Sequence, residues 1–210
     1  MKTFSNRYVF LYSAALVTVS ALILTVVSTS LKPRQERNRA VEKKQMILKA
    51  AGIASTPNTA EKLYAENIRE VNILDCDSLP AYLYETSCII PVQGTGLWGP
   101  IWGYICIDED WVIDGAVFDH NGETPGWGGE IATDAFAQRF IGKSCTDSLL
   151  TEFVPIVLKK QADPDSPYEV DAISGGTMTS NGVTAMLEEC LSRYQGYMLT
   201  NAGVQFPSKE

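Results

Sequence analysis

The stretch Asp171-Ala-Ile-Ser-Gly-Gly-Thr-Met-Thr-Ser-Asn-Gly182 combines four hydroxyl side chains and three glycines in twelve positions, directly before a run with apolar periodicity. Glycine lets successive backbone N–H groups converge, and a helix that begins just downstream adds the positive end of its dipole to the same place. The stretch therefore predicts an anion site that suits a phosphate group. A polar turn followed by an ordinary helix cap, with Thr179, Ser180 or Asn181 as the N-cap, explains the same residues equally well.

Apolar residues downstream of this stretch recur at the spacing of an amphipathic helix. The expected apolar face consists of Val183, Met186, Leu187, Cys190, Leu191 and Tyr194. Two further helical patterns lie upstream. One covers residues 131–140, and the other is a short helix capped by Thr59, whose apolar residues are Leu63, Ile68 and Val71.

Short apolar runs separated by turn residues predict strands in the remainder of the chain. The expected strand segments are residues 82–84, 88–92, 101–107, 111–118, 153–158 and 168–173. The runs at 101–107 and 111–118 suit a hairpin around Asp108-Glu109-Asp110, and Pro155 favours an edge position for its segment. We therefore expect an α+β domain with a mainly antiparallel sheet.

The N-terminal segment from Tyr8 to Leu31 contains no charged residue and lies between Arg7 and Lys32. As a helix it would extend about 36 Å, which is enough to cross a hydrocarbon core of about 30 Å. A cleaved signal peptide is the alternative, but the apolar core of a signal peptide usually has about 7–15 residues. We expect a retained transmembrane helix, followed over residues 34–51 by a helical stalk that stops at Gly52.

Charge is distributed unevenly along the chain. Residues 1–50 hold nine Lys or Arg and two Asp or Glu, whereas residues 51–210 hold eight and twenty-three. The acidic globular part argues against nucleic acid as a partner, because phosphate contacts would form in a repulsive field. The basic residues that follow the span suit anionic lipid headgroups, and by the positive-inside rule alone they would keep the globular part in the cytoplasm.

Two glycine-rich loops precede the stretch at 171–182. Residues 94–103 contain four glycines and the indoles Trp98 and Trp102, each of which we expect in the core, with stacking on a ligand as the alternative. In the second loop, residues 118–130, Glu123 and Thr124 precede a Pro-Gly turn and are placed to hydrogen-bond a polar group. We interpret His120, the only histidine, as structural or loop-organising, because it has no metal-binding partner and no evident catalytic triad.

The cysteines are too far apart in the sequence for a metal centre. They are Cys76, Cys88, Cys106, Cys145 and Cys190, and no Cys-x-x-Cys motif occurs. A zinc or iron–sulfur site is therefore not expected, and no metal ligand is assigned. Most of the cysteines should be buried small apolar residues; in an oxidising space one pair could bridge, with at least one thiol left free.

Three motifs together carry a family resemblance. Asp171-Ala-Ile-Ser-Gly-Gly-Thr177 resembles the flavinylation motif Asp-x-x-Ser/Thr-Gly-Ala-Thr, whose last threonine is esterified to the phosphate of FMN. With Gly-Leu-Trp-Gly-Pro-Ile-Trp-Gly at 96–103 and Glu-Thr-Pro-Gly at 123–126, the chain resembles, over essentially its whole length, the C subunit family of the sodium-translocating NADH:quinone reductase. Gly176 stands where that family usually has alanine, and Trp127-Gly128 where it has Leu-Gly.

The resemblance implies an organisation of the chain. It consists of an N-terminal tail (1–7), a transmembrane helix (8–31), a juxtamembrane helical stalk (32–56), a mixed α/β FMN-binding domain (57–199) and a flexible C-terminal tail (200–210). It also implies that FMN is held covalently on Thr177, transferred there from FAD by a separate flavin transferase, because nothing adjacent to Thr177 in the sequence would activate its hydroxyl. The flavinylation motif contains Asp171, and the remaining residues expected at the cofactor are Ser174, Gly175, Gly176, Thr179, Ser180, Glu123, Thr124 and Lys159.

The function that follows from the resemblance is electron relay inside a membrane complex that oxidises NADH, reduces quinone and exports sodium. Residues 94–99 have the spacing Gly-x-Gly-x-x-Gly but precede a predicted strand rather than the helix of a dinucleotide site, so NADH oxidation would belong to a partner. The alternatives are the FMN subunit of the related ferredoxin-linked ion-translocating complex, and a membrane-anchored ligand-binding module without a redox role. The family places its flavin domain on the periplasmic side of the cell inner membrane, which conflicts with the charge count.

Overall fold

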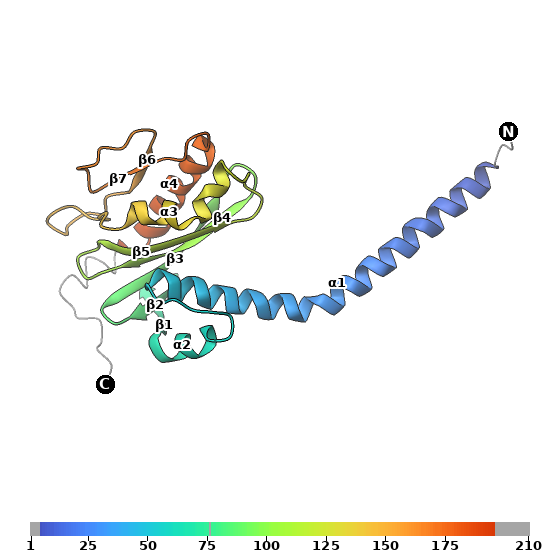
Figure 1. The fold of residues 1–210 in the computed structure, drawn as a ribbon, viewed down its shortest axis with the longest axis horizontal. Coiled ribbons are helices and arrows are strands. Elements are labelled where there is room, and N and C mark those ends of the chain that lie inside the picture. The colour runs from blue at the N-terminus through green and yellow to red at the C-terminus, as the bar shows by residue number, and fades with distance from the viewer. Residues whose placement is uncertain (1–4, 76, 196–210) are drawn as a thin grey trace. The chain divides into compact units, whose positions relative to one another are not determined.

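The computed structural model describes residues 5–75 and 77–195, and it divides the chain into two compact units, Met1–Glu42 and Lys43–Glu210 (Figure 1). A single helix, α1 (Asn6–Ala50), supplies most of the first unit and the start of the second. Its apolar segment is long enough to cross a membrane and is fully exposed, unlike the core helix of a soluble domain. The predicted tail at 200–210 lies outside the described residues.

The end of α1 is a regular C-cap. Gly52 has φ +74°, its N–H donates to the carbonyl of Lys49 at 3.0 Å, and the N–H of Ile53 donates to that of Leu48 at 2.8 Å. This pattern is a Schellman motif, in which glycine adopts the left-handed conformation at low cost. The predicted stop at Gly52 is confirmed, and the predicted span and stalk lie in one continuous helix with Pro33 inside it.

The second unit is built on a five-stranded antiparallel sheet, as predicted, with the strands in sequence order. The strands are β1 (Arg69–Asp75), β2 (Asp77–Tyr84), β3 (Ser87–Thr95), β4 (Pro100–Ile107) and β5 (Ile113–His120). The predicted hairpin is β4–β5, in which Ile105 pairs with Ala116. A separate parallel pair consists of β6 (Val157–Lys159) and β7 (Glu169–Asp171), so that only two residues of the predicted strand at 153–158 lie in a sheet.

Helices cover both faces of the sheet within the second unit (Figure 1). On one face lie α4 (Thr177–Ser192) and the short helical segments η1 (Gly128–Ala132), α3 (Asp134–Ala137) and η2 (Gln138–Phe140). The rings of Phe118, Phe136 and Phe140 pack there with centroids 5.0–5.5 Å apart. The last turns of α1 pack on the other face, where the carbonyl of Ala50 abuts Gly115 so closely that no Cβ would fit.

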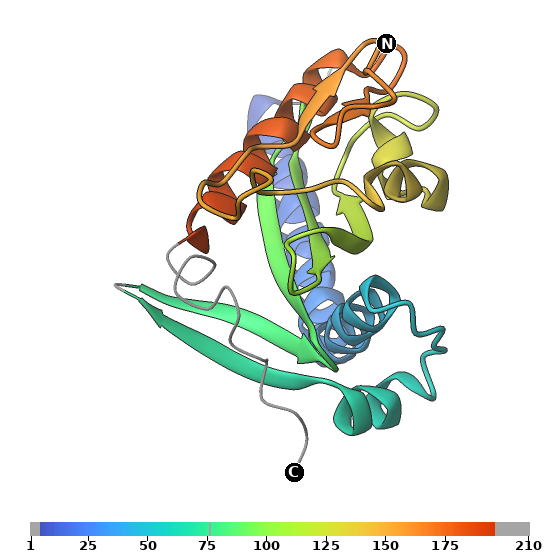
Figure 2. The ribbon, with the colours of Figure 1, turned by 90° about the vertical axis from the view of Figure 1, so that its left-hand side faces the viewer.

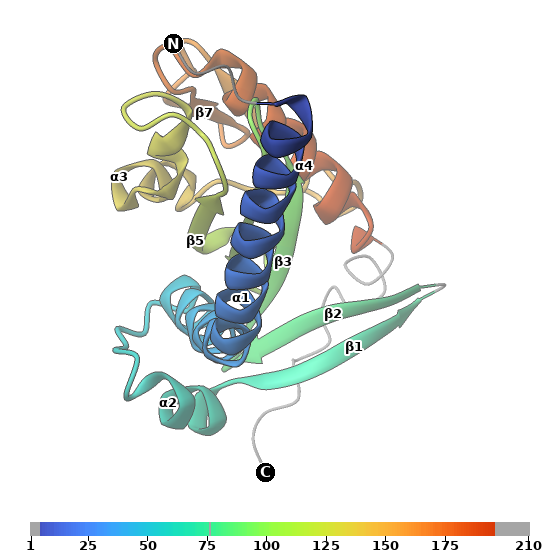
Figure 3. The same ribbon diagram turned by 90° about the vertical axis from the view of Figure 1, so that its right-hand side faces the viewer.

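β2 leaves β3 soon after their shared turn, and the β1–β2 hairpin diverges from the sheet (Figures 2 and 3). The pairing between these strands covers only Tyr82–Tyr84 on β2. The end of α4 covers part of the free edge of β3, because the thiol of Cys190 lies 3.4 Å from both the N–H and the carbonyl of Gln93. Tyr194 then donates its hydroxyl to the carbonyl of Pro80 at 2.7 Å, which joins the end of α4 to β2.

The structure corrects two predictions at helix boundaries. The short helix α2 (Ala60–Asn67) ends before Val71, which lies in β1 opposite Ala81. Alternating exposure along β1, with Val71 and Ile73 turned inward, is the strand pattern that the helical interpretation overlooked. Thr59 is the N-cap of α2, although its side chain makes no capping bond to the helix and instead contacts Thr56.

The second correction concerns α4. It begins at Thr177 with Gly176 as N-cap, so Thr179, Ser180 and Asn181 are not caps but lie inside the first turns of the helix. Three of the cysteines, Cys88, Cys106 and Cys145, are buried as predicted, and Cys190 is half-buried. Cys76 lies outside the described residues.

Candidate functional site

The start of α4 presents Thr177 at a bend made by two glycines. Gly175 has φ +76°, a conformation that a residue with a side chain rarely adopts. The N–H of Gly176 donates to the carbonyl of Ile173 at 3.0 Å, and the helix then begins with Thr177, whose side chain is exposed. The first N–H groups of a helix have no partner within it, so backbone donors and the positive end of the dipole surround this hydroxyl. The place suits a phosphate attached to Thr177 Oγ1.

The two hydroxyl residues after Met178 point inward and serve the fold. Ser180 is 1% exposed, and its Oγ accepts the N–H of Ile173 at 3.1 Å, which holds the loop against the helix. Thr179 is also 1% exposed, and its hydroxyl donates to Glu123 Oε2 at 2.6 Å. Neither hydroxyl is free to carry a group, so within residues 171–182 only Ser174 and Thr177 offer exposed hydroxyls.

Glu123 links three segments of the chain. Its carboxylate is 4% exposed, and Oε1 accepts the N–H of Trp98 at 2.8 Å. Burial alone would raise the pKa of Glu123, but hydrogen bonds from Thr179 and from the N–H groups of Trp98, Gly99 and Leu97 outweigh it and leave the pKa below its usual value. The carboxylate is therefore ionised near neutral pH. We call the three segments that it joins, residues 96–99, 121–128 and 173–180, the cradle.

Glycines leave room for this carboxylate. A Cβ on Gly96 would meet Glu123 Oε1, and a Cβ on Gly128 would overlap both Glu123 Oε2 and Thr179 Oγ1. Both positions require glycine for close approach rather than for an unusual backbone angle, since neither has a positive φ. The glycine-rich character of both loops is thus explained in part by the buried acid between them.

Large apolar side chains are exposed around the cradle. Among the described residues that follow α1, six such side chains are exposed, and four of them lie on the cradle: Leu97, Trp98, Trp127 and Met178. Trp98 is 69% exposed, so the prediction that it lies in the core is wrong. Glu123 accepts the backbone N–H of Trp98, while the indole is exposed. Trp127 lies against Gly175, with ring atoms 3.8–3.9 Å from the place of a Cβ there. The exposed indoles of the cradle form flat surfaces on which an aromatic ring can stack.

The second loop is organised around the backbone of Thr124 and the ring of His120. The carbonyl of Thr124 accepts the N–H groups of Trp127 and Gly129, while its side chain remains exposed. His120 Nε2 lies 3.2 Å from the place of a Cβ on Gly129, so the imidazole lies against this loop. In the described part of the chain, His120 Nδ1 is buried without a hydrogen-bond partner.

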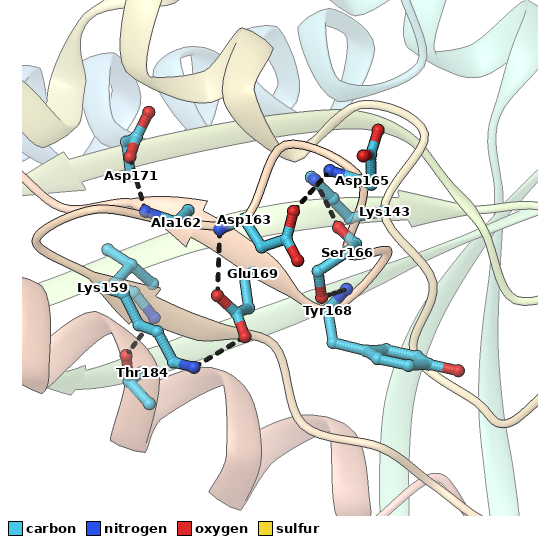
Figure 4. Close-up of polar contacts among 11 residues, drawn as sticks. Lys143, Lys159, Ala162, Asp163, Asp165, Ser166, Tyr168, Glu169, Asp171 and Thr184 are labelled. Carbon is cyan, nitrogen blue, oxygen red and sulfur yellow. Dashed lines mark hydrogen bonds and ion pairs between the residues drawn. The ribbon is translucent and has the colours of Figure 1, made fainter.

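Two of the predicted site residues make contacts of their own in the β6–β7 region (Figure 4). Lys159 Nζ forms an ion pair with Glu169 at 2.6 Å, and this contact lowers the pKa of Glu169. Asp171 Oδ1 accepts the N–H of Ala162 at 2.9 Å, which fixes the loop between the two strands. Neither side chain joins the Glu123 hydrogen-bond network, so their expected roles at the cofactor stay predictions.

Comparison with known proteins shows the family of the chain. Residues 96–192, which contain all three cradle segments, match the family model of the FMN-binding domain. The crystal structure of the C subunit of a Na(+)-translocating NADH-quinone reductase from Parabacteroides distasonis is 34% identical, with a TM-score of 0.71, and the match covers 81% of this chain and 97% of that one. The chain belongs to the C subunit family of this reductase.

More distant members of the family agree over most of their length. The C subunit of the Pseudomonas aeruginosa reductase is 26% identical, and the match covers 90% of this chain and 92% of the relative. The crystal structure of Shewanella oneidensis NqrC, at 19% identity, shares the fold with a TM-score of 0.64 over 80% of this chain and 98% of that one. The α+β fold with an antiparallel sheet is therefore that of the family.

Sequence reasoning found the hydroxyl that the structure exposes, but not the network beneath it. Glu123 and Thr179 are both expected near a cofactor, which stays a prediction; the structure adds that they are hydrogen-bonded to each other inside the protein. The exposure of Trp98 and Trp127 was also missed. Four glycines within ten residues were the available signal, because a loop with that composition has little side-chain volume in which to bury an indole.

Proposed function

We propose that this chain is a membrane-anchored flavoprotein subunit that carries FMN, covalently bound through its phosphate to Thr177 Oγ1. In this function it relays electrons within a complex that couples NADH oxidation and quinone reduction to sodium export. The observation that carries the proposal is the exposed Thr177 hydroxyl at the first residue of α4, where free helix N–H groups can hold a phosphate. Family membership supports the same assignment.

The residues of the cradle fit an FMN group. The N-terminal turn of α4 supplies donors and positive potential for the phosphate. Trp98 and Trp127 supply exposed indole faces for the isoalloxazine, and the polar side chains of Ser174 and Thr124 are also exposed on the cradle. When bound, FMN supplies the electron-transfer chemistry, and the protein's part is to hold it, orient it and set its electrostatic surroundings. Lys159 would have to leave Glu169 to offset the phosphate charge.

Attachment of FMN requires help from another protein. Among the described residues, Thr177 Oγ1 has no hydrogen bond to a base that could take its proton, and a threonine hydroxyl is a weak nucleophile. A flavin transferase that uses FAD satisfies the chemical balance: the bond from Thr177 Oγ1 to the FMN phosphorus forms, the pyrophosphate bond of FAD breaks, AMP leaves and the hydroxyl proton is released. The partners of the mature chain would be the other subunits of the complex and the membrane lipid around α1.

We infer that the domain lies on the periplasmic side of the cell inner membrane. The basic residues that follow the span favour the opposite side, but assembly with partner helices can override a modest Lys and Arg bias. Protease treatment of spheroplasts tests this orientation. Cleavage of the domain in intact spheroplasts is expected, and full protection until the membrane is opened would place the domain in the cytoplasm instead.

Intact mass spectrometry of the full chain, produced beside a flavin transferase, tests the attachment. We expect the mass to rise by that of FMN minus one water, and the Thr177→Ala variant to lack this increase. Ser174→Ala is the matched control, because Ser174 carries the other exposed hydroxyl of the stretch and should leave the increase intact. An unchanged wild-type mass, or a flavin that persists on Thr177→Ala, contradicts covalent attachment at this residue.

A further inference from the structure

Among the described residues, the Glu123 carboxylate is a buried charge without a cationic partner in its hydrogen-bond network. Its donors are the Thr179 hydroxyl, at 2.6 Å from Oε2, and the backbone N–H of Trp98, at 2.8 Å from Oε1. A buried charge is costly unless hydrogen bonds compensate it, and here the donors come from two other segments of the cradle. Each donor segment is thereby fixed relative to Glu123, although Thr179 lies 56 positions away from Glu123 in the sequence.

We propose that Glu123 is a positioning residue that holds the cradle in its flavin-binding form before any flavin arrives. This inference rests on the proposed function, because the segments that it fixes are those that present Thr177, Trp98 and Trp127. The carboxylate acts through its neighbours. It fixes the position of Trp98 by accepting the backbone N–H of that residue, and it fixes the position of Thr177 through Thr179, which lies in the same helical turn. Glu123 itself does not contact the reacting atoms.

An acceptor with two oxygens is essential to this arrangement. An ionised carboxylate has no hydrogen to donate, so both oxygens can face donors. A glutamine keeps the volume of the side chain but replaces one oxygen with an NH₂ group and removes the charge. The amide nitrogen then faces either the backbone N–H of Trp98, which loses its acceptor, or the Thr179 hydroxyl, which must turn to accept from it; in both cases the charge-assisted hydrogen bonds are lost. The glutamine side chain has little room to move to a new position, since Gly96 and Gly128 lie so close to the carboxylate that neither could carry a Cβ.

Hydrogen exchange of the full chain in detergent tests the proposal without flavin. In a Thr177→Ala background, which removes the proposed attachment point, Glu123→Gln is expected to speed exchange of the peptide covering residues 94–103 by about 10- to 100-fold, the range for losing a hydrogen bond to a charged group. Thr184→Val is the matched control. It removes one hydrogen bond from the same helix, which the Thr184 hydroxyl accepts from the Leu158 N–H at 3.0 Å (Figure 4), and it leaves the hydrogen bonds of Glu123 in place.

The flavin-loaded chain provides a readout that general loss of stability would not move. In protein with an intact Thr177 and full flavin attachment by mass, Glu123→Gln is expected to alter the visible circular dichroism of FMN and lower its fluorescence anisotropy, whereas Thr184→Val leaves both unchanged. The proposal is overturned if Glu123→Gln matches Thr184→Val in the exchange of residues 94–103, or leaves the flavin signals as in the wild type. If wild-type protein carries no covalent flavin, the proposed function fails, but the exchange experiment still decides the role of Glu123.

Discussion

Replacing Gly128 with alanine tests how tightly the buried acid of the cradle is enclosed. The added Cβ would overlap Glu123 Oε2 and Thr179 Oγ1, which are bonded to each other at 2.6 Å. Neither atom is the free end of a flexible side chain, because both are buried and hydrogen-bonded. The methyl group can be accommodated only if the Glu123–Thr179 contact opens or the loop shifts.

The size of the effect follows from these two consequences. A lost hydrogen bond to a charged group costs about 1.5–3 kcal/mol, and overpacking of a filled interior costs about 1–3 kcal/mol. We therefore expect Gly128→Ala to lower the free energy of unfolding by about 3–5 kcal/mol. At about 2–4 °C per kcal/mol for a domain of this size, the melting temperature should fall by about 6–20 °C.

Gly126→Ala is the matched control in the same loop. Gly126 has φ +76° and nothing within 4 Å of the place of a Cβ, so alanine there meets only the backbone penalty of about 1–2 kcal/mol. Thermal unfolding followed by tryptophan fluorescence, with both variants in the same detergent, gives the comparison. If Gly128→Ala is no more destabilising than Gly126→Ala, the close enclosure of Glu123 is refuted.

Two further predictions concern acid and thiol chemistry. Because the pKa of Glu123 is lowered in the folded state, its stabilising contribution is present above its usual pKa of about 4.3 and is lost as the pH falls through the folded value. Urea unfolding between pH 6 and 3 should show a steeper loss of stability for the wild type than for Glu123→Gln, and parallel curves would contradict the assigned shift. In a Cys76→Ser background, an alkylating reagent should modify Cys190 in the native protein. It should modify the other three thiols only after unfolding, because burial raises their pKa values to about 12. Intact mass counts the modified thiols, and labelling of more than one thiol in the native protein would contradict the burial of these three. These three are Cys88, Cys106 and Cys145.

Features encoded by neighbouring residues could be predicted from the sequence. The apolar segment of α1, the β4–β5 hairpin and the apolar face of α4 each depend on periodicity within a short window. β1 was missed because Leu63, Ile68 and Val71 also fit a helical spacing, and only the pairing with β2 decides between the two interpretations. The start of α4 was misplaced because its N-cap is Gly176, which carries no capping side chain to recognise.

The candidate site divides in the same way. Thr177 could be predicted because the residues that expose it, Gly175 and Gly176, adjoin it in the sequence. The bond between Glu123 and Thr179 could not, because it joins positions 56 residues apart and no local pattern records which hydroxyl turns inward. The exposed indole of Trp98 follows a second long-range contact of the same carboxylate, because Glu123 Oε1 accepts the backbone N–H of Trp98 from a position 25 residues away.

Closure of the sheet by α4 also imposes an order on biosynthesis. Gln93 on β3 meets Cys190 on α4 across 97 positions of the chain. While the polypeptide is being synthesised, the part of the sheet that α4 covers therefore remains uncovered until α4 has left the ribosome. The threonine-bearing turn acquires its shape only at that late stage. An enzyme that recognises the folded turn must act on a finished domain, whereas one that recognises the linear motif can act on the nascent chain.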